Sequence, residues 1–309
     1  KVIGLSTIER GSLFEELFTD PDNGFNKIFI PWSADPRRDE EWYKNTKRAL
    51  GDLITEEYQS TPAYDLINQS KDNLEAPHFL ILDEMNLSHV ERYFADFLSA
   101  IESGENIPLY GIDKDLEIPN NLFIIGTVNV DETTYMFSPK VLDRANVIEF
   151  KPDREEVLGL FDGTGVSSTV FAAQDGSAEA FLKLSEEIRT GERNELQNTS
   201  EIKALFEQIY DISQKYGYEF AYRTVKEIRQ YIIAAYELCE DKDAFNSKEV
   251  YDEQILQKIL PKIHGNKKEI GEYLNQLEKL CRENGLDLSR EKICMMEDRL
   301  SKIQYASFI

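Results

Sequence analysis

The chain has 309 residues, of which 41% are hydrophobic, and a formal net charge of −23 at pH 7. A chain of this length exceeds one ordinary compact core, so we expect two or three structural units. The negative charge excludes sequence-independent binding of nucleic acid by the surface as a whole, because such binding depends on lysine and arginine contacts to phosphates.

No apolar stretch reaches the length of a membrane-spanning helix, and no charged-then-apolar leader indicates secretion. Cys239, Cys281 and Cys294 show no CxxC spacing and no neighbouring histidine cluster. They are predicted to be reduced, buried thiols rather than metal ligands or catalytic groups. We therefore expect a cytoplasmic protein that does not contact the membrane.

Residues 1–62 are rich in aromatic and turn-forming residues, and the pattern predicts strand, helix, strand and helix. The four segments, in that order, are "KVIGLST", "GSLFEELF", "IFIPW" and "DEEWYKNTKRAL".

Residues 63–152 alternate between strand and helix. "APHFLILDE" is a predicted strand, and "SHVERYFADFLSAIESG" is a predicted helix with apolar residues near every third or fourth position. Ser88, with Glu91 three residues on, is its expected N-cap, and Gly104 is expected to end it. A hairpin, "NIPLYGIDKDLEIPNN", and two strands, "LFIIGTVNV" and "NVIEF", follow. Apolar strands separated by helices indicate a parallel sheet covered on both sides.

Residues 153–309 are predominantly helical in pattern. The glycine- and serine-rich stretch "FDGTGVSSTVFAAQDGSAE" is expected to be a linker or insertion. The predicted helices are "AEAFLKLSEEIRTG", "SEIKALFEQIYDISQKYG", "RTVKEIRQYIIAAYELCE", "EQILQKILPKI", "EIGEYLNQLEKLCRENG" and a last one from about Ser289 to Ile303.

Two acids, Asp83 and Glu84, follow the buried strand directly. In a parallel sheet, ligands gather at the carboxyl ends of the strands. Nucleotide hydrolysis uses such a pair, with one carboxylate for hydrated Mg²⁺ and one that orients or polarises the attacking water. The alternative is a strand that simply ends in solvated acids.

A second apolar strand ends in Asn129, so its amide is expected at the same edge beside Asp83. A neutral amide can donate a hydrogen bond to a phosphate or to the water without changing the charge around the metal. Arg144 precedes a further strand, and the planar guanidinium is suited to stabilising charge on a transferring phosphoryl group. The order of acids, amide and arginine predicts a nucleotide-hydrolysing site.

The sequence resembles the AAA+ module of the McrB group, the nucleotide-hydrolysing motor subunits of modification-dependent restriction systems. The resemblance covers about residues 63–309. The segments that carry it are "FLILDEMNLSHVERYFADFLSAIESG", "IPNNLFIIGTVNVDETTYMFSPKVLDRANVIEF", "FAYRTVKEIRQYI", "DEQILQKILPKIHG" and "KICMMEDRLSKIQYASFI".

This resemblance implies an α/β fold: part of an AAA+ P-loop NTPase-type parallel sheet core (63–152), followed by an α-helical lid domain (153–309). It implies that Asp83 and Glu84 are Walker B residues, with Asp83 the Mg²⁺ ligand. Asn129 is the implied sensor 1 within an N-x-D element that also contains Asp131.

The resemblance further implies that Arg144, preceded by Asp143, is an arginine finger acting on a neighbouring subunit. Arg223, near the start of a lid helix, is a weaker sensor-2 candidate, and pairing with Glu227 is the alternative. The implied assembly is a homo-oligomeric ring, a hexamer, with GTP or ATP between subunits. The implied partners are an McrC-like nuclease subunit and DNA bound through the assembled complex.

The phosphate-binding motif GxxxxGK[ST], expected before residue 77, is absent from the sequence. Residues 1–62 resemble instead a fragment of the large terminase subunit of tailed phages, through "VIGLSTIERGSLFEELF" and the "PW…RD…W" stretch. The chain is thus expected to join two fragments near residue 62, by truncation or by fusion. We expect it to hydrolyse neither GTP nor ATP measurably. The rival functions are a non-catalytic pseudo-NTPase assembly protein and a DNA-packaging fragment.

Overall fold

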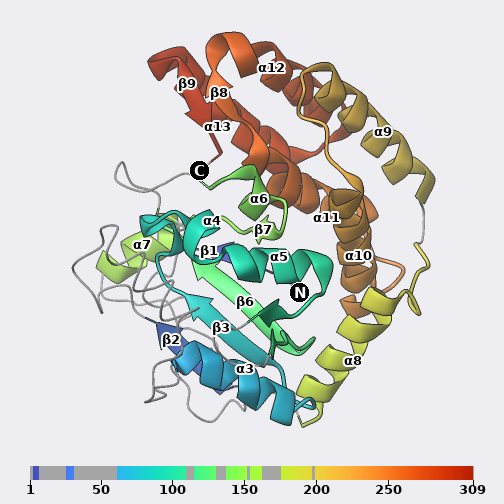
Figure 1. Ribbon diagram of the computed structural model, residues 1–309. Helices are drawn as coiled ribbons and strands as arrows, with labels where there is room; N and C mark the ends of the chain where they lie inside the picture. Colours follow the sequence, from blue (N-terminus) through green and yellow to red (C-terminus); the bar gives the residue numbers. More distant parts are fainter. Residues whose placement is uncertain are drawn as a thin grey trace. The chain divides into compact units, whose positions relative to one another are not determined.

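The computed structural model describes residues 61–108, 115–129, 137–151, 154–161, 175–196 and 199–308, together with strands 3–6 and 26–30 (Figure 1). The chain divides into two compact units, Lys1–Lys183 and Leu184–Ile309. The first unit contains a parallel sheet and the second is mainly helical. The protein is therefore a mixed α/β chain, as predicted.

The sheet of the first unit has five strands in the order β2-β3-β6-β1-β7, and every neighbouring pair is parallel (Figure 1). This arrangement confirms the predicted parallel sheet. The strands are β1 (Ile3–Ser6), β2 (Asn26–Ile30), β3 (His78–Leu82), β6 (Leu122–Thr127) and β7 (Ala145–Val147).

Strands β1 and β2 come from the terminase-like segment 1–62, yet they share backbone hydrogen bonds with the strands of the AAA+-like segment. β1 lies between β6 and β7, and β2 pairs with β3. The sheet therefore continues across the expected junction near residue 62. The division between the units falls after Lys183 and not at residue 152, because Phe181 packs on Phe123 of β6, with ring centroids 5.1 Å apart.

The core of the sheet is apolar, as the sequence of β3 and β6 requires. Leu80, Ile81, Leu122 and Ile124 are at most 1% exposed. Burying one such side chain contributes about 1.5–3 kcal/mol. Helix α3 (Pro62–Asp72) packs against β2 and β3 (Figure 1) and begins at Thr61, whose side chain accepts a hydrogen bond from the Tyr64 amide. The parallel register of β3 and β6, which pairs Leu82 with Gly126, fixes which ends of the two strands meet.

The single helix predicted for residues 88–104 is instead two short helices, α4 (Val90–Tyr93) and α5 (Ala95–Ser103). A 3₁₀ turn, η2 (Met85–Leu87), precedes them. The expected N-cap Ser88 is wrong, because α4 begins after His89 and no side chain caps it. The end at Gly104 is confirmed, with φ 72° in the left-handed region that glycine adopts readily.

The predicted hairpin is confirmed as β4 (Ile107–Pro108) paired antiparallel with β5 (Asp115–Leu116). Helix α6 (Pro139–Leu142) then leads into β7, which is shorter than the predicted strand. Helix α7 (Arg154–Phe161) was not predicted as a separate helix, and it ends at the first residue of the expected linker. Most of that linker, residues 162–174, lies outside the described residues.

The helical unit confirms most of the predicted helices. They are the second half of α8 (Ser177–Thr190), α9 (Thr199–Lys215), α10 (Tyr222–Leu238), α12 (Lys267–Asn284) and α13 (Asp287–Ile303). The helix predicted from "EQILQKILPKI" is a composite of α11 (Ser247–Gln254), a π-helical turn η3 (Ile255–Ile259) and a 3₁₀ turn η4 (Leu260–Lys262). An antiparallel pair that the sequence did not predict, β8 (His264–Asn266) with β9 (Tyr305–Ser307), joins the two ends of the α12–α13 hairpin.

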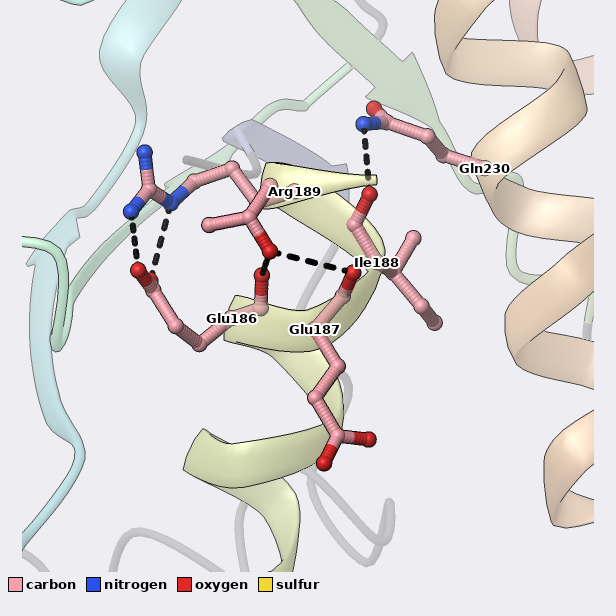
Figure 2. A network of polar contacts seen from close by, with 6 residues as sticks. Glu186, Glu187, Ile188, Arg189 and Gln230 are labelled. Atoms are coloured by element: carbon pink, nitrogen blue, oxygen red, sulfur yellow. Dashed lines mark hydrogen bonds and ion pairs between the residues drawn. The ribbon is translucent and has the colours of Figure 1, made fainter. Parts of the chain in front are cut away.

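Polar contacts tie the carboxyl-terminal half of α8 to α10. Figure 2 shows Gln230 of α10 donating a hydrogen bond to the Ile188 carbonyl, at 3.3 Å. The same view shows Arg189 paired with Glu186 on α8 itself, an exposed pair that contributes little to stability. Arg193 follows α8 and pairs with Glu187 and with Glu237 of α10.

The three thiols are free, but they do not share one environment. Cys281 is buried, Cys239 is half-buried and Cys294 is exposed. The expectation of buried thiols is therefore confirmed for Cys281 and wrong for Cys294. Within the described residues, no helix has the length and apolar character needed to cross a membrane.

Candidate functional site

The candidate site lies where β3 and β6 end. Leu82 and Gly126 are in register, so the residues that follow them leave the sheet side by side. The Thr127 hydroxyl donates a hydrogen bond to Asp83 Oδ1, at 2.6 Å, and accepts one from the Glu84 amide, at 2.7 Å. The turn after β3 is therefore held against the last residue of β6.

Glu84 has a left-handed backbone conformation, with φ 48° and ψ 47°. A residue other than glycine in this region costs about 1–3 kcal/mol and persists only where its surroundings hold it. Here the hydrogen bond from the Glu84 amide to Thr127 holds it. The turn reverses the chain, so that the side chains of Asp83 and Glu84 are both available at the end of the sheet.

The Asn129 side chain reaches the same place. Its Nδ2 donates a hydrogen bond to Glu84 Oε1 at 2.9 Å. These contacts confirm the predicted proximity of the two acids and the amide. In return, Asn86 Nδ2 donates to the Asn129 carbonyl at 3.1 Å, so the two turns are tied in both directions.

Tyr93 supports the turn from α4. Its hydroxyl donates a hydrogen bond to the Met85 carbonyl at 3.0 Å. Burial raises the pKa of the Tyr93 phenol, and the nearby Glu91 carboxylate raises it further, so the hydroxyl remains a donor at neutral pH. This bond ties the 3₁₀ turn η2 to α4.

The residues present fit a magnesium ion that is shared with a nucleotide. Asp83 uses Oδ1 to accept from Thr127, and within the described part of the chain its Oδ2 has no hydrogen-bond partner. No group of three or more His, Cys, Asp or Glu side chains that could hold a metal occurs among the described residues. Mg²⁺ commonly takes one or two carboxylates, several waters and substrate phosphates, which is what this donor set can supply.

Arg144 lies elsewhere. It precedes β7, and since the strands are parallel, the beginning of β7 lies at the edge opposite to the acids. The register pairs Ala145 with Ile3 and Ile3 with Ile124, which places Arg144 about 13 Å below Thr127 along the strand direction. Its Nε donates to the Leu98 carbonyl at 2.9 Å and its guanidinium pairs with Glu102, both on α5. The structure therefore does not bring Arg144 to the acids of its own subunit.

The structure does not test the other two predicted residues as parts of this site. Arg223 is in the first turn of α10, which belongs to the other compact unit, and Glu227, its suggested partner, pairs with the buried Lys258. Asp131 lies outside the described residues.

The carboxyl end of β1 lies at the same edge of the sheet, where a phosphate-binding loop would have to follow it. Ser6, the last residue of β1, is in register with Thr127, so the chain leaves β1 beside the acids. β1 is flanked by β6 and β7. The chain runs from β1 to β2, on the β6 side of β1, and later from β6 to β7, on the other side of β1. Such a reversal of strand order marks the usual ligand position in a parallel sheet. The sequence after Ser6, "TIERGSLF", lacks the lysine of a P-loop.

Sequence reasoning missed two members of the site, Thr127 and Asn86. Both are almost completely buried, at 2% exposed, although both are polar. Each lies two residues from a predicted site residue, Thr127 from Asn129 and Asn86 from Glu84, and this closeness in the sequence could have identified them. A hydroxyl that ends an apolar strand and an amide just after a pair of acids are short side chains suited to bonding neighbouring backbone.

Comparison with known proteins adds one finding. Residues 170–305 match a family described as a domain of unknown function (DUF8727). The match covers the helical unit and leaves the five-stranded sheet outside it. No curated protein matches the chain.

Proposed function

We propose that this chain is an incomplete McrB-like AAA+ nucleotide hydrolase subunit, with no GxxxxGK[ST] motif in its sequence, whose site is formed by Asp83, Glu84 and Asn129. The observation that carries the proposal is the 2.9 Å hydrogen bond from Asn129 to Glu84, beside Asp83, at the carboxyl ends of two adjacent parallel strands. A metal-binding carboxylate, a second carboxylate and a neutral amide are the groups that phosphoanhydride hydrolysis requires. The parallel sheet followed by a helical unit supports an AAA+ core and lid.

Each residue has a distinct role in this proposal. Asp83 binds the nucleotide's Mg²⁺ through Oδ2, since Oδ1 is engaged by Thr127. The ion supplies positive charge against the phosphates. Glu84 orients the attacking water through Oε2, while Asn129 holds Oε1 and so fixes the direction of the carboxylate. Arg223 is the proposed sensor 2, and Asp131 the proposed acid of the N-x-D element.

The assembly part of the proposal rests on the family resemblance. The subunits form a hexameric ring in the cytoplasm with GTP or ATP between them, and hydrolysis drives movement along DNA and activates an McrC-like nuclease of a restriction system. In this proposal Arg144 is the finger that reaches the neighbouring subunit. It would then exchange its bonds to Leu98 and Glu102 for the neighbour's phosphate.

The metal ligand is tested with Mn²⁺ in place of Mg²⁺. The chain has four methionines, and Met85 adjoins Glu84, so a ¹³C-methyl methionine spectrum reports on the site. We expect Mn²⁺ to broaden the Met85 signal (assigned with Met85→Leu) at lower concentration when GTP or ATP is present, because the phosphates add ligands. Asp83→Asn should abolish this broadening, and the exposed Asp96→Asn on α5 should not. Equal broadening in wild type and Asp83→Asn would refute the proposal.

A second function, a non-catalytic pseudo-NTPase that occupies a position in such a ring, is favoured by the absence of GxxxxGK[ST] from the sequence. Nucleotide-dependent assembly separates the two, because a chain without a phosphate-binding loop should not change its oligomeric state with GTP or ATP. Turnover that is lost in Glu84→Gln would exclude the pseudo-NTPase. A DNA-packaging role for residues 1–62 is less favoured, because β1 and β2 belong to the same sheet as β3.

A further inference from the structure

The turns after β3 and β6 are joined by four hydrogen bonds, one of which is the bond from Asn129 to Glu84 described above. Thr127 of β6 bonds to the β3 turn, through Asp83 Oδ1 and the Glu84 amide. Asn86 of the β3 turn bonds back to the Asn129 carbonyl. None of these contacts occupies Asp83 Oδ2 or Glu84 Oε2, the two oxygens that remain for a ligand.

The Thr127 hydroxyl both donates and accepts in this position. It has one proton, which it donates to Asp83 Oδ1, and one of its lone pairs accepts from the Glu84 amide. A hydroxyl that bonds to an ionised carboxylate makes one of the stronger hydrogen bonds in proteins. The bond from the Glu84 amide also compensates the left-handed strain of Glu84. Removing the hydroxyl therefore leaves the Asp83 carboxylate and the Glu84 backbone without the contact that holds them.

Asn86 has a spare acceptor in the same place. Its Nδ2 donates to Asn129, but its Oδ1 is buried and has no hydrogen-bond partner within the described part of the chain. An unpaired buried acceptor is costly, about 1–3 kcal/mol, and is uncommon in native structures. An acceptor left open beside a proposed metal and water site can be satisfied by an ordered water of that site.

We propose that Thr127 and Asn86 are positioning residues for the Asp83–Glu84–Asn129 site: Thr127 sets the direction of the Asp83 carboxylate and holds the Glu84 backbone, and Asn86 fixes the Asn129 backbone and accepts a hydrogen bond from a bound water. This inference rests on the proposed function. It goes beyond the proposed function because it assigns the orientation of the site's residues to two uncharged side chains that do not touch the metal. Residues that orient metal ligands typically contribute 10- to 100-fold in metal affinity.

The alternative is that Thr127 is only a satisfied polar residue of the core. Three variants separate these readings, with Mn²⁺ broadening of the Met85 methyl as the readout. Thr127→Val keeps the shape and removes the hydroxyl, and Thr127→Ser keeps the hydroxyl and removes the methyl. Ile125→Val, on the same strand, removes one methylene without a polar change and serves as the control.

We expect Thr127→Val to weaken Mn²⁺ binding about 10- to 100-fold, and Thr127→Ser and Ile125→Val to bind within about threefold of wild type. If Thr127→Val does not fold, Thr127→Ala removes the same hydroxyl without placing a methyl beside Asp83. Asn86→Leu should also weaken binding, because it removes both the donor to Asn129 and the open acceptor.

The outcomes distinguish this inference from the proposed function. Binding in wild type that is lost in Asp83→Asn but unchanged in both Thr127→Val and Asn86→Leu would overturn the inference and leave the proposed function standing. Weakening of equal size in Thr127→Val and Thr127→Ser would also overturn it, because the hydroxyl would then not be the cause. Wild type without any binding that depends on Asp83 would overturn both.

Discussion

Asn121 should be one of the most sensitive positions of the sheet unit, although it is far from the candidate acids along β6. It is 4% exposed and stands at the start of β6. Its Nδ2 donates to the carbonyls of Ser70, Asn73 and Ala76, at 2.9, 2.8 and 2.9 Å. These carbonyls belong to the end of α3 and the loop that leads into β3, so one amide holds the whole α3–β3 connection.

The magnitude follows from what Asn121→Leu would leave unpaired. Ser70 is among the last four residues of α3, whose carbonyls have no partner within the helix, and it is fully buried. Losing its donor costs about 1–3 kcal/mol. Asn73 is exposed, and the Ala76 carbonyl keeps its bond to His78 Nδ1, so these two carbonyls add no more than about 1 kcal/mol together. The unpaired Asn121 Oδ1 is removed as well, and we expect a net loss of about 2–3 kcal/mol.

Hydrogen exchange measured by mass spectrometry tests this estimate locally. Peptides that cover α3 and β3 should exchange about 30- to 150-fold faster in Asn121→Leu than in wild type, since each 1.4 kcal/mol is a factor of ten. Peptides from α12 and α13 in the helical unit should not change. The neighbouring, exposed Asn120→Ala is the matched control. If the exchange of α3 and β3 in Asn121→Leu equals that in the control, the reasoning is refuted.

Three further predictions concern other buried groups. Burial, with the charges of Asp252 and Glu278, raises the pKa of the Cys281 thiol to about 12. Iodoacetamide at pH 8 should therefore modify Cys239 and Cys294 in the native protein, and Cys281 only in denaturing urea. Equal labelling of Cys281 and Cys294 in the native protein would contradict this prediction. Burial lowers the pKa of His78 below 6.5, and the bond to the Ala76 carbonyl opposes part of this shift. Protonation of His78 therefore opposes folding, and the sheet unit should lose stability as the pH falls below 6.5. In urea denaturation this loss should be smaller in His78→Asn than in wild type, and the same as wild type in His89→Gln. Asp252 accepts hydrogen bonds from the Leu288 and Ser289 amides at the start of α13, at 2.9 and 3.0 Å. Asp252→Ala should therefore lower the free energy of unfolding of the helical unit by about 2–4 kcal/mol in urea denaturation. The exposed control Asp287→Ala should change it by less than about 0.5 kcal/mol.

The sequence predicted those parts of the site that depend on strand direction alone. An apolar run that ends in Asp83 and another that ends near Asn129 must place these residues at one edge once the strands are parallel neighbours. The same reasoning locates Arg144 at the opposite edge, because it precedes its strand instead of following it. The long helices α9, α10, α12 and α13 were predictable because their apolar periodicity extends over several turns.

What the sequence did not predict depends on tertiary contacts. The 3₁₀ turn η2 was not predicted, and the bond that holds it, between Tyr93 and the Met85 carbonyl, is not encoded by any local pattern. Thr127 and Asn86 became recognisable only when β3 and β6 were placed side by side, since each bonds to a residue more than forty positions away. The short strands β8 and β9 contain three residues each and have no periodicity to detect.

The most direct test of the account is a crystal structure of this chain grown with Mn²⁺ and GTP or ATP, with anomalous data collected at the manganese edge. The account predicts an anomalous peak about 2.0–2.3 Å from Asp83 Oδ2, with the Asn129 amide still bonded to Glu84. A structure in which Mn²⁺ is bound away from Asp83, or in which Asn129 and Glu84 are separated, would contradict it.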